Sequence, residues 1–187
     1  ISLEIDDPDN GKGIDYSDSI TGSTCFYISG FKLEPGQIVK VTNGTTTKIH
    51  TIIDLAVTDF DETAETLTGK ANPGEVKIYA DDGNTFAWRN PTANSEGLWE
   101  ADFSGVIDIA PGTGGNARQY DDDRDYTDIT WSIPDPVMEI NPISDHIAGN
   151  DWTPNTTITL SFKDQTWEGQ SNDLGNIGFD MDPFDVL

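Results

Sequence analysis

Short runs in which every second residue is apolar constrain the fold of this chain more than any other feature of its sequence. Val76 and Ile78 belong to one such run, and the same spacing recurs over residues 99–103, 129–133 and 158–162. A period of two places successive side chains on opposite faces of a β-strand. Gly, Pro, Asn and Asp separate the runs, and no segment keeps a helical spacing over two turns. The pattern predicts an all-β fold made of antiparallel β-sandwich modules.

The clearest hairpin prediction spans residues 38–53. Two runs rich in β-branched residues, 38–42 and 45–53, flank the dipeptide Asn43-Gly44. Asn-Gly accommodates the two positive φ values of a type I′ turn, which joins twisted antiparallel strands. We therefore expect a tight two-residue turn here.

Prolines mark the best domain boundary, at Pro134-Asp135-Pro136. Two residues with a fixed φ and no amide donor interrupt any sheet. We expect a partial module of strand and hairpin over residues 1–53, a complete sandwich over 54–133, and a second, partial or composite module over 134–187.

Net charge excludes several classes of function. The 187 residues include 34 Asp and Glu against 10 Lys and Arg, a formal charge of -24. A nucleic-acid binder needs a basic surface to displace counterions from phosphates, so that class is excluded. No apolar stretch approaches the ~20 residues of a membrane helix, so we expect no membrane insertion. Cys25 is the single cysteine, so an intrachain disulfide cannot form.

Two phrases recur along the chain. A glycine, a short spacer, Pro-Gly or Pro-Asn and an alternating strand occur at 30–41, 69–78 and 149–160. A polar stretch that contains glycine and leads into a strand occurs at 94–103 and again at 172–179. Repetition of this kind is typical of tandem modules.

Residues 68–103 resemble the bacterial immunoglobulin-like repeats of extracellular and surface proteins, of the adhesin or stalk type. The matching positions are Thr68-Gly69, Ala71, Pro73-Gly74, Gly97 and Trp99. The resemblance implies immunoglobulin-like sandwiches and a non-enzymatic, structural or adhesive role outside the cell or on a bacterial-type cell surface. Residues 134–187 match in part, with Ile177 where the module has Trp99, and the segment before residue 24 does not match.

A run of acidic residues is the best candidate metal site. Asp121, Asp123 and Asp125 alternate, and Asp128 follows. Calcium takes 6–8 oxygen ligands, which loops with alternating carboxylates supply. The run lacks the glycine and bidentate glutamate of an EF-hand, and Arg124 supplies a compensating charge. A calcium site and a solvated acidic loop both remain open.

The tryptophans raise an alternative function, that of a carbohydrate-binding accessory module of a secreted enzyme. Trp88, Trp99 and Trp131 lie in alternating runs, where we expect them in the core. Trp152 and Trp167 lie near turns and are the candidate glycan-binding residues. No motif points to catalysis, and a pair of carboxylates has no weight among so many acidic residues.

The ends of the sequence suggest assembly. Ile1, Leu3 and Ile5 alternate as the inward face of a donated strand would, which predicts a homopolymer or filament formed by strand sharing. Pairing of this strand within its own chain is the alternative. Residues 184–187 resemble 31–34, which precede a Pro-Gly turn and a hairpin, so the chain is expected to stop where another hairpin would begin.

Overall fold

The computed structural model describes residues 1–22 and 25–180, and within them it contains 18 β-strands and one short 3₁₀ turn. The strand pairs run antiparallel, which confirms the all-β prediction. The chain divides into two compact units, Ile1–Trp131 and a second that begins at Ser132. The predicted Pro134–Pro136 boundary lies just after this division. The residues that resemble 31–34, residues 184–187, lie outside the described part.

The N-terminal sheet, strands β1 to β4, has the order β2-β1-β3-β4. Its strands are β1 (Ser2–Asp6), β2 (Ile14–Ser19), β3 (Ile38–Thr42) and β4 (Thr47–Thr51), with a 3₁₀ turn at Pro8–Asn10. The β3–β4 hairpin confirms the predicted pairing, but its turn is longer than expected. Gly44 has a positive φ and Asn43 does not. The Asn43 carboxamide oxygen instead accepts the N–H groups of Thr45 and Thr46, so the asparagine caps a four-residue loop.

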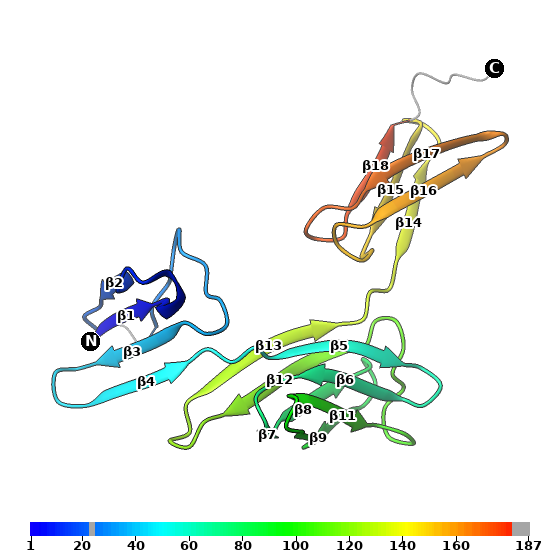
Figure 1. Cartoon of the computed structure of the whole chain (residues 1–187). Helices are drawn as coiled ribbons and strands as arrows, with labels where there is room; N and C mark the ends of the chain where they lie inside the picture. The colour runs from blue at the N-terminus through cyan, green and yellow to red at the C-terminus, as the bar shows by residue number, and fades with distance from the viewer. Residues whose placement is uncertain (23–24, 181–187) are drawn as a thin grey trace. The chain divides into compact units, whose positions relative to one another are not determined.

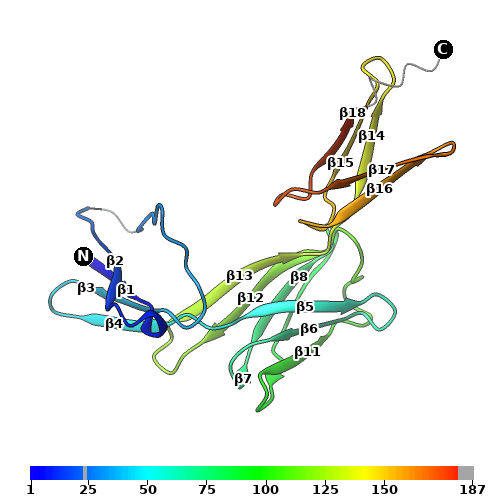
Figure 2. The same ribbon diagram turned by 45° about the horizontal axis from the view of Figure 1, so that its top comes forward.

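The central sandwich, strands β5 to β13, has two main sheets with the orders β11-β6-β5 and β13-β12-β8-β9 (Figures 1 and 2). Its strands are β5 (Ala56–Asp61), β6 (Thr66–Lys70), β7 (Gly74–Glu75), β8 (Lys77–Asp81), β9 (Phe86–Arg89), β10 (Thr92–Ala93), β11 (Leu98–Asp102), β12 (Gly114–Tyr120) and β13 (Tyr126–Ser132). β7 and β10 form a short separate pair.

The core of the central sandwich contains most of the residues that alternation predicted. Val76, Ile78, Trp99, Ala101 and Phe103 are all 3% exposed or less. Three expectations were wrong. Ile129 and Trp131 are only half-buried. Trp88 is 54% exposed, because Ala87 is the residue of β9 that faces the core.

The C-terminal unit, strands β14 to β18, consists of a sheet β14-β15-β18 and a β16–β17 hairpin (Figure 1). Its strands are β14 (Val137–Asn141), β15 (His146–Asn150), β16 (Thr157–Phe162), β17 (Gln165–Gln170) and β18 (Ile177–Asp180). In the described part of this unit, Ile133 is the one apolar side chain that is buried.

The strands of the C-terminal unit have the same order as the strands in the first part of the central sandwich. β14, β15 and β18 pair in the same order as β5, β6 and β11. Trp99 pairs with Gly69 across β11 and β6, and Ile177 pairs with Gly149 across β18 and β15.

The turns of the two regions also match. Asp61 accepts two backbone N–H groups in the β5–β6 turn, as Asn141 does in the β14–β15 turn. Asn94 and Asn172 each accept two backbone N–H groups in the turn before β11 or β18. The second recurring phrase therefore marks the same turn in both places.

The N-terminal sheet repeats the other half of the plan. Its order β2-β1-β3-β4 corresponds to β9-β8-β12-β13. Pro35-Gly36 before β3 therefore corresponds to Pro111-Gly112 before β12, and the two glycines have φ values of 90° and 89°. The first recurring phrase placed Pro35-Gly36 alongside Pro73-Gly74, but Gly74 begins β7, the short strand that precedes β8.

Candidate functional site

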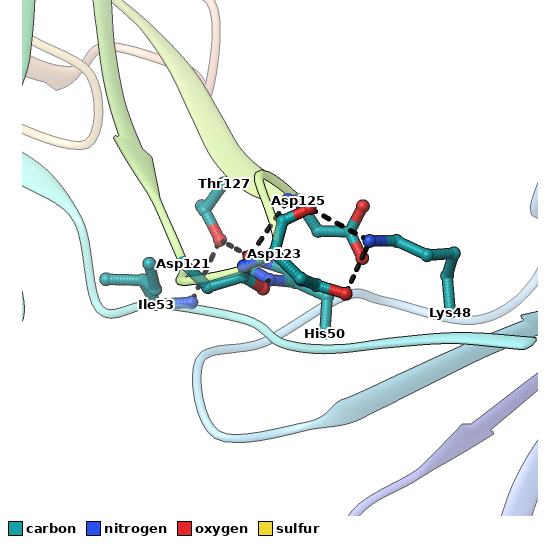
Figure 3. Close-up of polar contacts among 7 residues, drawn as sticks. All are labelled: Lys48, His50, Ile53, Asp121, Asp123, Asp125 and Thr127. Carbon is teal, nitrogen blue, oxygen red and sulfur yellow. Dashed lines mark hydrogen bonds and ion pairs between the residues drawn. The ribbon is translucent and has the colours of Figure 1, made fainter.

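The acidic run lies in the turn between β12 and β13, where it contacts β4 of the N-terminal sheet. Figure 3 shows Lys48 and His50 of β4 directed at the turn residues Asp121, Asp123 and Asp125. We call these five residues the acidic-turn site. They come from parts of the chain more than 70 residues apart, with a sequence separation of 75 between Lys48 and Asp123.

The Asp121 carboxylate organises the turn. Its Oδ1 accepts the N–H groups of Asp123 at 3.2 Å and Asp125 at 2.9 Å. The Asp121 N–H donates to the carbonyl oxygen of Asp125 at 2.9 Å. Arg124 takes a positive φ of 70°, which turns the chain back into β13. The short acidic side chains are therefore held on one side of the turn.

His50 joins the turn to the end of β4. Its Nδ1 lies 2.7 Å from Asp121 Oδ2 and its Nε2 lies 3.0 Å from Thr127 Oγ1. The backbone N–H of Ile53 donates to the same Thr127 oxygen at 3.0 Å. A neutral His50 satisfies all three contacts if Nδ1–H donates to Asp121 and the Thr127 hydroxyl donates to Nε2. The hydrogen bond from His50, together with the N–H groups of the turn, lowers the pKa of Asp121 to about 2.

Lys48 supplies a positive charge to the remaining two carboxylates. Its Nζ forms an ion pair with Asp123, lies 3.1 Å from Asp125 Oδ2, and donates to the carbonyl oxygen of Asp123 at 3.0 Å. The hydrogen bond to Asp123 raises the pKa of Lys48. An ammonium group thus lies where a metal ion bound by Asp123 and Asp125 would lie.

Three of the four predicted metal ligands come together. Carboxylate oxygens of Asp121, Asp123 and Asp125 lie within 4.8 Å of one another, a spacing that can hold a metal ion. Asp128 is not part of this group, and its Oδ1 accepts from Arg118 Nε at 3.0 Å. Three carboxylates and the Asp123 carbonyl are hard oxygen donors, which suit calcium or magnesium better than zinc.

The predicted glycan-binding residues lie in the C-terminal unit. Trp152 is half-buried, and its indole Nε1 would be 2.4 Å from a methyl group on Gly149. The Trp99 ring covers Gly69 in the same way in the central sandwich. The Trp152 ring, which comes from a loop, therefore packs against Gly149 as the Trp99 ring, which comes from a strand, packs against Gly69. Trp167 is half-buried on β17 opposite Leu160.

The predicted strand donor is the inner strand of its own sheet. β1 pairs with β2 on one side and with β3 on the other. Leu3 and Ile5 are buried at 3% and 0% exposure, while Ile1 is 55% exposed.

Sequence reasoning missed an aromatic and basic surface on the outer face of the β13-β12-β8-β9 sheet. The Tyr79 ring lies 4.9 Å from the Trp88 ring and 6.0 Å from the Phe86 ring. Beside these rings, Lys77 and Arg118 line a shallow depression of about 200 Å³. The rest of its lining consists of Tyr79, Trp88, Asn116 and Asp128. We call this surface the aromatic face. Trp88 lies in an alternating run of the sequence, which is why it was expected in the core.

Of the comparisons with known proteins, the one with solved structures gives matches. No protein-family model matches the sequence, and a search of curated proteins found no match. A solved structure described as a tetra-tandem repeat in the extending region of a large adhesion protein is 14% identical to this chain, with a TM-score of 0.33. The alignment covers 95% of this chain, which spans 57% of the length of that chain. In the described residues, no helix is long and apolar enough to cross a membrane.

Proposed function

We propose that this chain is part of an extracellular structural or adhesive protein built from tandem immunoglobulin-like β-sandwich modules. The observation that supports the proposal is the repetition of one strand plan. The central sandwich contains the whole plan, the N-terminal sheet contains one half of it, and the C-terminal unit repeats its first five long strands. Tandem modules of this kind act as spacers, because each module contacts only its neighbours. Such a role on a cell surface requires no catalytic group.

Direct tests of this role are mechanical and cellular. Pulled between its ends, the chain should show a discrete unfolding event of the central sandwich. The 77 residues from Ala56 to Ser132 should release roughly 270 Å of contour length at ~3.5 Å per residue. Antibodies against the chain should label intact host cells, and mild protease treatment of the cells should remove the label. Labelling that requires permeabilised cells would contradict the proposed location.

Calcium binding at the acidic-turn site is part of the proposal. A divalent ion held by Asp121, Asp123 and Asp125 would relieve like-charge repulsion in a chain of net charge -24. Binding to the folded state raises the melting temperature by mass action. We expect calcium to raise the melting temperature and chelator to lower it. Asp123→Ala should abolish the response, whereas the matched change Asp122→Ala, outside the group of three, should keep it. Identical melting with calcium and with chelator contradicts a stabilising site.

We also propose strand sharing between copies of this chain, in which β1 is the strand that is exchanged. Because β1 already lies between β2 and β3, sharing requires β1 to leave its sheet and take the same place in another copy. Sedimentation of the full chain should then show polymers, which deletion of residues 1–6 removes. A chain that sediments as a monomer at high concentration with calcium present contradicts this form of assembly.

A second candidate function, saccharide binding, is favoured by the aromatic face rather than by Trp152 and Trp167. Exposed rings next to fixed polar groups are a usual arrangement for oriented ligand binding. The rings of Tyr79 and Trp88 are tilted by 50°, so they do not form one flat platform. A polysaccharide panel tested by affinity electrophoresis should show retardation that Trp88→Ala removes and Trp167→Ala does not. Equal retardation of all three chains, or none, would contradict a site on this face.

A further inference from the structure

β16 of the C-terminal unit has a free edge where its counterpart does not. In the central sandwich, β8 pairs with β9 on one side and with β12 on the other. In the described residues, β16 pairs with β17 and with no other strand. A strand edge with unpaired N–H and C=O groups is a template for another strand.

Apolar side chains on β16 and β18 are only partly covered. Ile158 and Leu160 on β16 and Ile177 and Phe179 on β18 are all half-buried. Their counterparts are closed off from solvent, with Ile78 at 0%, Trp99 at 3% and Ala101 at 2% exposure. The C-terminal unit therefore has the strands of the module without the cover of its core.

The central sandwich shows what supplies this cover. The segment after β11 contributes apolar side chains that are 2% exposed or less, namely Phe103, Ile107, Ile109 and Ala117. Its Gln119 side chain accepts from the N–H of Asn72 at 2.9 Å and donates to the carbonyl of Asn72 at 2.7 Å. One segment thus pairs with β8, covers the core and fastens the loop before β7.

The chain contains this covering element a second time. Residues 31–51 also have apolar residues two apart, a Pro-Gly turn and a hairpin, β3–β4, which pairs with β1. The turn bonds match as well. Gln37 N–H donates to the Glu34 carbonyl and Thr113 N–H donates to the Ala110 carbonyl.

We infer that the C-terminal unit is an acceptor for a β-hairpin of this kind, which pairs with the free edge of β16 and covers Ile158, Leu160, Ile177 and Phe179. The partner is a polypeptide segment with two apolar residues two apart, a Pro-Gly turn and a strand whose inward side chains cover the apolar face. The inference concerns the fold and holds whether or not the protein is adhesive.

The test uses the full chain and a synthetic peptide with the sequence of residues 103–133. Amide hydrogen exchange of residues 157–162 should slow at least tenfold when the peptide is added, while residues 77–81 should not change. The core-facing change Ala117→Asp in the peptide should abolish the effect. The matched change Asn116→Asp adds the same charge on the outer face and should leave the effect intact.

If the peptide is poorly soluble, the same segment is fused to the chain instead. Residues 103–133 are placed directly after Asp180, and exchange at residues 157–162 should slow to the same extent. No slowing in either form overturns the inference. Equal slowing by the Ala117→Asp version also overturns it, because binding would then not depend on the covered apolar face.

Discussion

The central sandwich and the C-terminal unit share strand order, turns and glycine positions, but only one of them has a closed core. Ile78 and Phe103 are both 0% exposed in the central sandwich. In the C-terminal unit, Phe162 and Met138 are more than half exposed, at 53% and 57%. Strand pairing and turn hydrogen bonds are local and form in both regions. Core closure depends on the later segment 103–132, which lacks a counterpart in the described part of the C-terminal unit.

This difference predicts where a lost side chain matters most. Phe103→Ala should destabilise the central sandwich by about 3–5 kcal/mol, because it leaves a cavity in a closed core. The matched change Phe162→Ala should cost the C-terminal unit less than about 1 kcal/mol, because that ring is already in contact with solvent. Denaturant unfolding, followed by NMR signals from each unit, measures both. Equal costs would mean that the two cores are closed to the same degree.

Added volume should discriminate between the same regions. Gly69→Ala places a Cβ 2.1 Å from both the Ala56 carbonyl oxygen and the Trp99 ring, so backbone must move. Its cost should lie at the upper end of ~1–3 kcal/mol. Gly149→Ala meets side-chain atoms of Trp152 and Ile177, which can shift, so its cost should lie at the lower end. The reverse order, measured in the same unfolding experiment, would show that the C-terminal unit is packed more rigidly.

Substitution of Trp152 tests whether the C-terminal unit and the central sandwich pack a tryptophan ring in the same way. If its ring replaces that of Trp99, Trp152→Ala should destabilise the C-terminal unit by about 2 kcal/mol, roughly half the cost of a fully buried ring. Trp152→Phe should recover part of the loss, and the central sandwich should melt as before. Loss of saccharide binding without loss of stability would instead assign Trp152 to a ligand site.

The smallest expected effect concerns the acidic-turn site, whose carboxylates lie in the central sandwich and which has no counterpart in the described part of the C-terminal unit. Lys48→Met removes the ammonium from the carboxylates of Asp123 and Asp125. Calcium affinity measured by titration calorimetry should rise, because the ion no longer competes with an internal cation. The control Lys163→Met, whose ammonium lies over the Phe162 ring, should leave the affinity unchanged. A lower affinity after Lys48→Met would show that Lys48 supports the site rather than competing for it.

Alternation predicted the fold class and most of the central core, since a period of two separates the faces of each strand. It could not say which face packs inward on β9, where Ala87 is buried and Trp88 is exposed. Asp121, Asp123 and Asp125 are near neighbours in sequence, so their proximity was predictable. Lys48 and His50 were not, because only tertiary structure brings β4 to that turn. The correspondence of β3 with β12 likewise required the sheet order, which local phrases do not contain.

Hydrogen exchange of the full chain alone tests the central claim most directly, namely that one strand plan is closed in the central sandwich and open in the C-terminal unit. The amides of residues 77–81, paired on both sides, should exchange only through global unfolding of the sandwich. Those of residues 157–162, paired on one side, should exchange at least ~100-fold faster through local opening. Equal protection of the two strands would contradict the claim.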